Sequence, residues 1–244
     1  MNILITRAKD ESLRMALEFE KLGHFAIIDP LITIIPISNW FENYQLLKQN
    51  IDLIVFTSKY AIREFASKEK HRAMDILVVG KKSFIEAKKY NFINIEAANG
   101  NVESLIAKIL SEKKTRKILY LSGNKLSLEL DEILIKKGLN CKKLQLYQTS
   151  YTAKLKDNTV SLLLDQKVDI IIIYSRQTAI TFKENIEKLT RKIDFSQVKL
   201  FVLSFKIANE LKIFNWNEVL IYNNNKLLTE YDIISVIDGG LKGE

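Results

Sequence analysis

The chain contains one heptapeptide pattern twice, as Asp-Leu-Ile-Val-Phe-Thr-Ser at Asp52–Ser58 and as Asp-Ile-Ile-Ile-Ile-Tyr-Ser at Asp169–Ser175. Each copy places an uninterrupted apolar run between an aspartate and a serine. Continuous apolar runs of this length are typical of strands that are buried on both faces of a sheet. Because such sheets are parallel and carry helices on both sides, the repeated heptapeptide indicates an α/β protein.

Longer amphipathic segments alternate with short apolar runs along the chain. Further short runs occur at 3–6, 76–79, 118–121 and 200–203, and segments with helical periodicity follow at Glu11–Leu22, Lys125–Lys137, Gln177–Leu189 and Lys206–Phe214. In the first of these segments, Met15, Phe19 and Leu22 lie on one helical face, with charged residues opposite. The alternation predicts parallel strands joined by right-handed helical crossovers.

The repetition extends beyond the heptapeptide and defines two kinds of unit. Residues 80–92 align with 204–216 and share Lys, Glu, Lys and Asn at equivalent positions. The interval from Ile3 to Gly23 equals that from Ile118 to Gly138, with a strand, a helix and a glycine at the helix end in each. We call the unit that contains 3–23 or 118–138 unit A. We call the unit that contains a heptapeptide followed by 80–92 or 204–216 unit B. Their order along the chain is A (1–29), B (52–97), A (117–145) and B (169–222).

This order predicts two interleaved domains with one unit of each kind. The middle B and A units follow each other directly in the chain and can form one continuous domain. The first A and the last B unit can then form the other domain only if the two ends of the chain come together. We expect a discontinuous lobe of 1–32 plus 151–244, an inserted lobe of 38–146, and linker strands at 30–37 and 147–151. Pro30 and Pro36 both fall in the first linker, where each proline favours an extended preceding residue. Division into sequential halves near residue 115 is the alternative.

The composition excludes several kinds of function. The chain of 244 residues has 37 Lys and Arg against 29 Asp and Glu, a net charge of +8, but the lysines are scattered. We therefore expect anionic small molecules rather than nucleic acid as partners. One Cys and two His exclude a disulfide framework and a structural zinc site. His24, His71 and Cys141 are expected at a helix end, in an exposed loop and in a packed strand.

Sequence motifs for nucleotides, secretion and membranes are missing. The first strand is not followed by Gly-x-Gly-x-x-Gly, and the chain has no Walker loop. The N-terminal segment lacks the basic and long apolar regions of a secretory signal, and no apolar stretch is long enough to span a membrane. We therefore expect a cytoplasmic protein with no membrane contact.

The turns after the predicted strands are the expected ligand site. Ligands of open parallel sheets bind beyond the carboxyl ends of the strands. Small or polar residues occupy six of these turns, at Thr6-Arg7, Thr57–Lys59, Gly80–Ser83, Ser122–Lys125, Ser175-Arg176 and Ser204. Backbone N–H groups at the start of a helix can hold an anion. Serine at such positions also caps helices in any α/β fold, so capping alone stays an alternative for each.

Several short motifs, taken in order, resemble the uroporphyrinogen-III synthase family over nearly the whole chain. They are Ile3-Leu-Ile-Thr-Arg7, Leu22-Gly-His24, Val55-Phe-Thr-Ser58, Val78-Val-Gly80, Ile118-Leu-Tyr-Leu-Ser-Gly123, Leu146-Tyr147 and Ile173-Tyr-Ser175. The resemblance implies two similar parallel-sheet, flavodoxin-like α/β lobes, one inserted into the other and joined by a two-stranded linker.

The resemblance also implies a reaction of haem biosynthesis, without cofactor or metal. Hydroxymethylbilane loses its hydroxyl as water, and the terminal ring attacks the resulting azafulvene through a spiro intermediate. Ring D is inverted and the macrocycle closes as uroporphyrinogen III, so the expected enzyme is a cyclising hydro-lyase. The substrate carries eight carboxylates, which suits N–H-rich turns. A monomer is expected, with a transient contact to hydroxymethylbilane synthase as the only protein partner.

Residue by residue, the resemblance assigns catalysis to Tyr147, which matches the family tyrosine at the second linker. Its implied role is to assist departure of the hydroxyl, and a structural tyrosine in the strand is the alternative. The substrate-binding residues implied are Arg7, Thr57, Ser58, Ser83, Ser122, Gly123, Asn124, Ser175 and Ser204. One position departs from the family pattern, because Ile207 stands where many members have Thr. Ser204 or Lys206 would then replace the missing hydroxyl.

Three other functions are alternatives to this one. A non-catalytic two-lobed binder of small anionic metabolites would share the architecture, but no signal peptide or appended signalling segment accompanies it here. A sugar- or nucleotide-handling transferase with two Rossmann-like domains would need a nucleotide loop, which is missing. A nucleic-acid binder would rest on the net charge alone.

Overall fold

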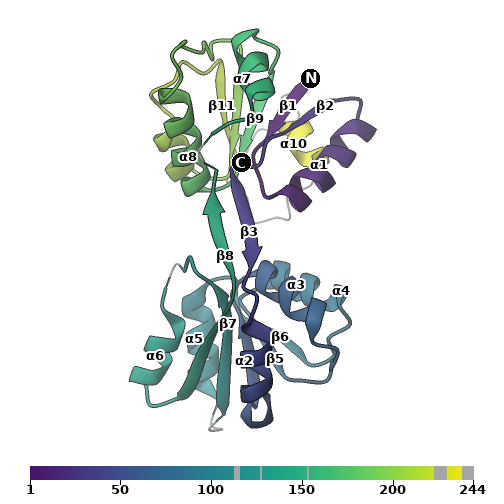
Figure 1. Cartoon of the computed structure of the whole chain (residues 1–244), viewed down its shortest axis with the longest axis vertical. Helices are drawn as coiled ribbons and strands as arrows, with labels where there is room; N and C mark the ends of the chain where they lie inside the picture. The colour runs from purple at the N-terminus through teal and green to yellow at the C-terminus, as the bar shows by residue number, and fades with distance from the viewer. Residues whose placement is uncertain (113–115, 127, 153, 223–229, 238–244) are drawn as a thin grey trace. The chain divides into compact units, whose positions relative to one another are not determined.

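The computed structural model describes residues 1–112, 116–126, 128–152, 154–222 and 230–237. The chain divides into two compact units, Met1–Thr33 with Ser150–Glu244, and Ile34–Thr149. We call them the outer unit and the inserted unit. Both crossings between them fall within strands, β3 (Ile32–Pro36) and β8 (Asn140–Tyr151). These strands are neighbours in one sheet, as Figure 1 shows.

The outer unit is built on a five-stranded sheet in the order β11-β10-β9-β1-β2. Every neighbouring pair in it is parallel. Its strands are β1 (Asn2–Ile5), β2 (Phe25–Ile28), β9 (Ile170–Ile173), β10 (Lys199–Val202) and β11 (Glu218–Ile221). Its helices are α1 (Lys9–Lys21), α7 (Asp157–Leu164), α8 (Arg176–Glu187), α9 (Phe205–Glu210) and α10 (Glu230–Ile237).

Both faces of this sheet are buried, because alternate residues of each strand enter different cores. Ile3 and Ile5 of β1 pack in a cluster with residues of α1 and α10. Leu4, between them, packs in a second cluster with residues of α7, α8 and α9. The apolar run of the strand thus serves two helical layers, which explains why it is continuous rather than alternating.

The inserted unit has six strands in the order β3-β8-β7-β4-β5-β6. Its remaining strands are β4 (Leu53–Phe56), β5 (Ile76–Val78), β6 (Ile95–Ala97) and β7 (Lys117–Gly123). One face packs against α2 (Trp40–Leu47), α3 (Lys59–Lys68) and α4 (Lys81–Lys89), and the other against α5 (Val102–Ser111) and α6 (Leu130–Lys136). A short 3-10 helix, η1 (Lys48–Asn50), follows α2.

None of the described helices is long and apolar enough to cross a membrane.

The strands of the two units have the same spatial order, but the chain begins at a different strand of that order in each unit. In the outer unit the order from one edge is β2, β1, β9, β10, β11, and in the inserted unit β8, β7, β4, β5, β6 takes the same places. The two copies of the heptapeptide form the central strands β4 and β9. This is the flavodoxin-like order, with the topological switch points between β1 and β9 and between β7 and β4. The predicted α/β class with parallel sheets is confirmed.

Two of the predicted helices differ in length from their expected bounds. The helix expected from Lys125 begins at Leu130, the first of its buried apolar residues; Ser127, within the expected range, lies outside the described residues. The helix expected to reach Phe214 ends at Glu210. Just beyond it, the indole Nε1 of Trp216 donates to the Leu211 carbonyl at 2.8 Å, which satisfies a backbone acceptor that a continuing helix would have used.

Candidate functional site

The carboxyl ends of β4, β7 and β8 meet at one edge of the inserted unit. β4 pairs with β7, and β7 pairs with β8, both in parallel register. Thr57 and Ser58 directly follow β4, Gly123 ends β7, and Tyr147 lies opposite Gly123 in β8. The predicted catalytic residue and three of the predicted substrate-binding residues are therefore brought together within one unit.

Tyr147 is held in place by the turn that follows β4. Its phenol donates a hydrogen bond to Ser58 Oγ at 2.8 Å, although the two residues lie 89 positions apart in the chain. Its ring packs edge-on against that of Tyr60, with 6.0 Å between the ring centroids. The side chain is only 6% exposed. A buried phenol with a defined partner is restrained in both position and direction.

Ser58 connects this tyrosine to the start of α3. Ser58 is the N-cap of the helix, and its Oγ accepts from the backbone N of Tyr60 at 3.2 Å. With the bond from Tyr147, both lone pairs of the hydroxyl are engaged. The O–H hydrogen of Ser58 remains, so the serine can also act as a donor when its acceptor role toward Tyr147 ends.

A second hydroxyl pair lies beside the first. Thr57 Oγ1 and the phenol of Tyr120 are 2.9 Å apart and share a hydrogen bond. Burial raises the pKa of Tyr120, and the hydrogen bond with Thr57 partly offsets this rise. Tyr120 was not predicted as a site residue because it lies inside the apolar run of β7. Its phenol, in the middle of an otherwise hydrocarbon run, was the only signal in the sequence.

The remaining predicted residues of the inserted unit differ in accessibility. Asn124 is exposed, and its Oδ1 accepts from the backbone N of Thr149 at 2.7 Å. Ser83 lies in the first turn of α4 and is 7% exposed. Ser122 is fully buried, and its Oγ has no hydrogen-bond partner among the described residues. As placed, the Ser122 side chain offers no surface to a ligand.

In the outer unit, Arg7 lies in the turn after β1. Its guanidinium pairs with the Glu11 carboxylate, one helical turn further on, and lies 4.6 Å from the centre of the Tyr174 ring. The Arg7 side chain is 18% exposed and that of Glu11 5%. Tyr174 belongs to the heptapeptide that forms β9, the strand next to β1. This arrangement presents a fixed cation at the switch point of the outer sheet.

The two predicted serines of the outer unit are helix caps. Ser175 Oγ accepts from the backbone N of Thr178 at 3.1 Å and lies 2.7 Å from its hydroxyl. Ser204 caps α9 by accepting from the backbone N of Ile207 at 3.4 Å. Ile207 itself is 5% exposed and packs in the core with α7 and α8. The isoleucine at the family's threonine position is thus a core residue, and Lys206 beside it is exposed.

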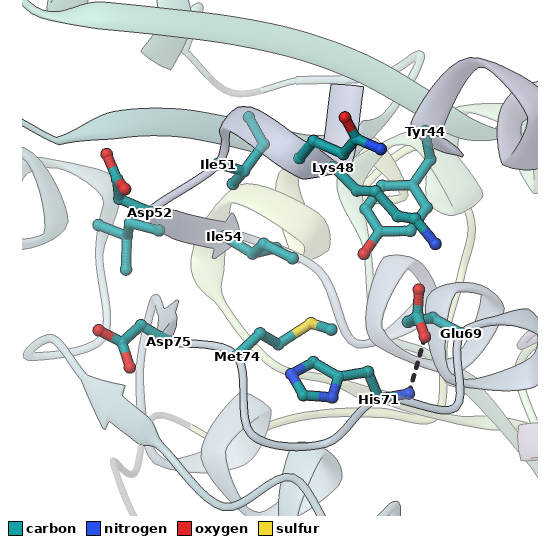
Figure 2. A pocket seen from close by; sticks show the side chains of 11 residues that line it. Tyr44, Lys48, Ile51, Asp52, Ile54, Glu69, His71, Met74 and Asp75 are labelled. Carbon is teal, nitrogen blue, oxygen red and sulfur yellow. Dashed lines mark hydrogen bonds between the residues drawn. The ribbon is translucent and has the colours of Figure 1, made fainter. Parts of the chain in front are cut away.

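A cavity of about 420 Å³ lies in the inserted unit, at the opposite end of its sheet from Ser58 and Tyr147. Figure 2 shows its lining, which includes Tyr44, Glu69, His71 and two aspartates. Asp52 precedes β4 and Asp75 precedes β5, so the cavity is at the amino ends of the strands, opposite the turns described above. Its acidic groups have structural partners: Asp52 accepts from the backbone N of Lys117, and Glu69 from that of His71.

A family model described as uroporphyrinogen-III synthase HemD matches residues 14–226. The chain belongs to the uroporphyrinogen-III synthase family. It is a cyclising lyase of tetrapyrrole biosynthesis, as the motif resemblance implied. None of the curated proteins compared with it matches its sequence.

Two solved structures of the same description share its fold. One is uroporphyrinogen-III synthetase from Helicobacter pylori, at 15% identity and a TM-score of 0.60, covering 97% of this chain and 99% of that chain. The other is a mutant uroporphyrinogen III synthase from the extremely thermophilic bacterium Thermus thermophilus, at 14% identity and a TM-score of 0.58, covering 98% of each. At such low identity these neighbours support the fold alone.

Each histidine and the cysteine of this family member lies apart from the candidate site residues of its own unit, which are Tyr147 in the inserted unit and Arg7 in the outer unit. His71 is exposed in the segment between α3 and β5, and His24 lies between α1 and β2. Cys141 is buried in β8, and burial raises the pKa of its thiol to about 12. A thiol with so high a pKa is protonated at neutral pH and is a poor nucleophile.

Proposed function

We propose that this family member converts hydroxymethylbilane to uroporphyrinogen III with Tyr147 as the acid that assists loss of the hydroxyl. The observation that carries this assignment is the 2.8 Å hydrogen bond from the buried Tyr147 phenol to Ser58 at the carboxyl edge of the inserted sheet. A phenol fixed at a ligand-binding edge can donate a proton to a departing group.

Ser58 gives this step a means of charge stabilisation. When Tyr147 turns its proton from Ser58 to the substrate hydroxyl, the C–O bond breaks and water leaves with that proton. The phenolate that remains can then accept the Ser58 hydrogen, because a serine hydroxyl both donates and accepts. The substituted α-carbon of ring D attacks the azafulvene and forms the spiro intermediate. The bond from that carbon to the bridge on ring C then breaks and re-forms at the other α-carbon of ring D, which inverts the ring. The proton that this second carbon loses as the pyrrole ring is regained restores the phenol. The net change is loss of one water.

Binding of the polycarboxylate substrate is the role we assign to the other turns. Arg7 supplies a positive charge that Glu11 and Tyr174 hold in one orientation. Thr57, Ser83, Ser175 and Ser204 start or directly precede helices, where backbone N–H groups favour carboxylates. Asn124 is exposed directly after β7 and would contribute its side-chain amide. For Ser122 and Gly123, both buried, contact through the backbone is the role that their position allows.

The main task of such a site is to choose the product isomer. The substituted carbon of ring D must reach the azafulvene before the unsubstituted carbon does, which is a matter of orientation. A site made of fixed hydrogen-bond donors can impose that orientation without a cofactor. We further propose that the protein acts as a cytoplasmic monomer, and that hydroxymethylbilane synthase hands over the substrate in a transient contact.

The test is an isomer analysis. Purified protein is supplied with hydroxymethylbilane made in place by a deaminase, and the uroporphyrins are separated after oxidation. We expect isomer III to exceed the isomer I formed without the protein. If isomer I alone appears while the protein still binds the bilane, the chain is a non-catalytic anion binder and the proposed function is wrong.

A further inference from the structure

We propose that Gly123 is a positioning residue for the reaction, because the absence of a side chain there lets the Tyr147 ring lie against the β7 backbone. The inference rests on the proposed function, in which Tyr147 is the acid. It assigns Gly123 a role that acts through the tyrosine, in addition to the backbone contact with the substrate proposed above.

The first observation is a bulge where β7 meets β8. The two strands pair in steady register from Lys117 to Ser122, which lies opposite Gln145. The next pair is Gly123 with Tyr147, so Leu146 is passed over. A bulge places two successive residues on one side of a strand. Leu146 and Tyr147 accordingly belong to the same core cluster, together with residues of α2 and α3.

The second observation is the closeness of the ring to Gly123. A Cβ atom built on this glycine would lie 2.4 Å from Cζ, 2.5 Å from Cε2 and 2.8 Å from the phenol oxygen of Tyr147. All three distances are below any contact that carbon atoms tolerate. Gly123 is not among the glycines with positive φ, so the ring and not the backbone conformation is what excludes a side chain.

An alanine at Gly123 would therefore displace the tip of the tyrosine. The ring can move, since it is the end of a side chain, whereas the backbone of β7 is paired with β4 as far as Leu121 and with β8 as far as Gly123. Ser58 and Tyr60 contact the ring elsewhere, and a displaced phenol loses its 2.8 Å bond to Ser58. A displacement of about 1 Å at a catalytic group lowers the rate roughly 10²-fold.

The experiment compares Gly123→Ala in two backgrounds, the natural chain and Tyr147→Ala, which removes the ring atoms that a Cβ would strike. In the natural chain we expect turnover to fall roughly 10²-fold with KM little changed. In the Tyr147→Ala background we expect no further loss of turnover and no loss of melting temperature. Gly138→Ala is the matched control: Gly138 has a φ of +82° and open space around it, so the variant loses stability but keeps its activity.

A second measurement does not depend on activity. In protein labelled with ¹³C at tyrosine Cζ, the Tyr147 resonance is identified by its loss in Tyr147→Ala. We expect Gly123→Ala to shift this resonance more than any other tyrosine signal. If the resonance stays in place and turnover is unchanged, the inference is wrong. The inference is also wrong if Gly123→Ala lowers turnover or melting temperature by the same amount in the Tyr147→Ala background as in the natural chain.

The outcomes separate this inference from the proposed function. If the unaltered protein yields isomer I alone, the proposed function fails, whereas the shift of the Tyr147 resonance still tests the contact with Gly123. If isomer III forms normally in Gly123→Ala, the proposed function stands and the positioning role is lost. If Gly123→Ala does not fold in the natural chain, folding of the double variant like Tyr147→Ala supports the contact, and failure of both contradicts it.

Discussion

The turns after β4 and β9 come from the same repeated heptapeptide, yet they carry different chemistry. In the inserted unit, Ser58 caps its helix and also accepts a hydrogen bond from Tyr147. In the outer unit, the side chain of the matching Ser175 bonds only to Thr178 among the contacts described, and Tyr174 before it lies under the Arg7 guanidinium. One backbone arrangement thus places an O–H group in one unit and a cation in the other.

The strands that correspond to each other at the sheet edges explain the difference. β8 runs for 12 residues and places Tyr147 at the end of β7, opposite Gly123. Its counterpart β2 has 4 residues and ends at Ile28. Asp29 follows and is 2% exposed, with its carboxylate accepting from the backbone N of Lys156. We infer that chemistry resides in the inserted unit and that the outer unit contributes binding.

The largest expected effect is that of Tyr147→Phe. Removing the phenol oxygen deletes the acid but keeps the ring against Gly123 and Tyr60. General acid catalysis typically contributes about 10²- to 10⁴-fold, so we expect kcat to fall by at least roughly 10²-fold with little change in KM. Steady-state kinetics on hydroxymethylbilane and a thermal melt check this. Turnover equal to that of the natural protein would remove Tyr147 from the mechanism.

Arg7→Gln should weaken binding of the substrate rather than slow the chemical step. A charge-assisted hydrogen bond contributes about 1.5–3 kcal/mol, so loss of the guanidinium should raise KM roughly tenfold or more and leave kcat nearly unchanged. The double variant Arg7→Gln/Glu11→Gln is the control, because it leaves no buried Glu11 carboxylate without its cation. A fall in kcat with constant KM in both variants would contradict the division of roles between the units.

Ser58→Ala and Ser175→Ala form a matched pair. Each removes the N-cap of a helix, which costs about 1 kcal/mol of unfolding free energy, and urea unfolding should report similar losses. Only Ser58→Ala also removes the partner of Tyr147. A hydrogen bond of about 1 kcal/mol corresponds to a roughly fivefold lower kcat for that variant alone. Equal activity losses in the two variants would show that capping explains both serines.

The smallest expected effect is a difference in stability between variants of two equivalent glutamates, one in each unit. Glu86 and Glu210 occupy equivalent repeat positions, and each bonds an arginine, Arg63 at 2.5 Å and Arg176 at 2.6 Å. The Glu86 side chain is 8% exposed and that of Glu210 24%. At pH 7 we expect Glu86→Gln to cost about 1–2 kcal/mol and Glu210→Gln less than about 0.5 kcal/mol.

The pH dependence follows from the direction of the Glu86 shift. Burial opposes ionisation, but the hydrogen bonds and charges of Arg63 and Lys89 together outweigh it and lower the pKa of Glu86 below its usual 4.5. A folded-state pKa below the unfolded one adds stability above the unfolded pKa and loses it as pH falls through the folded pKa. The difference between the natural chain and Glu86→Gln should therefore shrink below about pH 4.5. A difference that grows in acid would refute the assignment.

The sequence was sufficient for the parts of this structure that depend on local pattern. The apolar heptapeptides predicted β4 and β9, and the strand-end turns were found because polar residues follow each apolar run. Serine at those turns also predicted capping, which Ser58, Ser175 and Ser204 all provide. These inferences need only hydrophobic periodicity and the preferences of helix ends.

The contacts that decide the chemistry could not be predicted in this way. The bulge beside Leu146 depends on how β8 pairs with β7, and a shift of one residue changes the face on which Tyr147 lies. The hydrogen bond between Tyr120 and Thr57 joins residues 63 positions apart. Ile207 departs from the family pattern, and only its place in the core shows that it fills space there.

The most direct test of Tyr147 as the acid uses two substrates that differ in the leaving group. In the aminomethyl analogue of hydroxymethylbilane, the leaving group is an ammonium that already carries its proton at neutral pH and needs no acid. We predict that Tyr147→Phe is slower than the natural protein by roughly 10²-fold on hydroxymethylbilane but by only a few-fold on the analogue. The same large factor on both substrates would contradict the account.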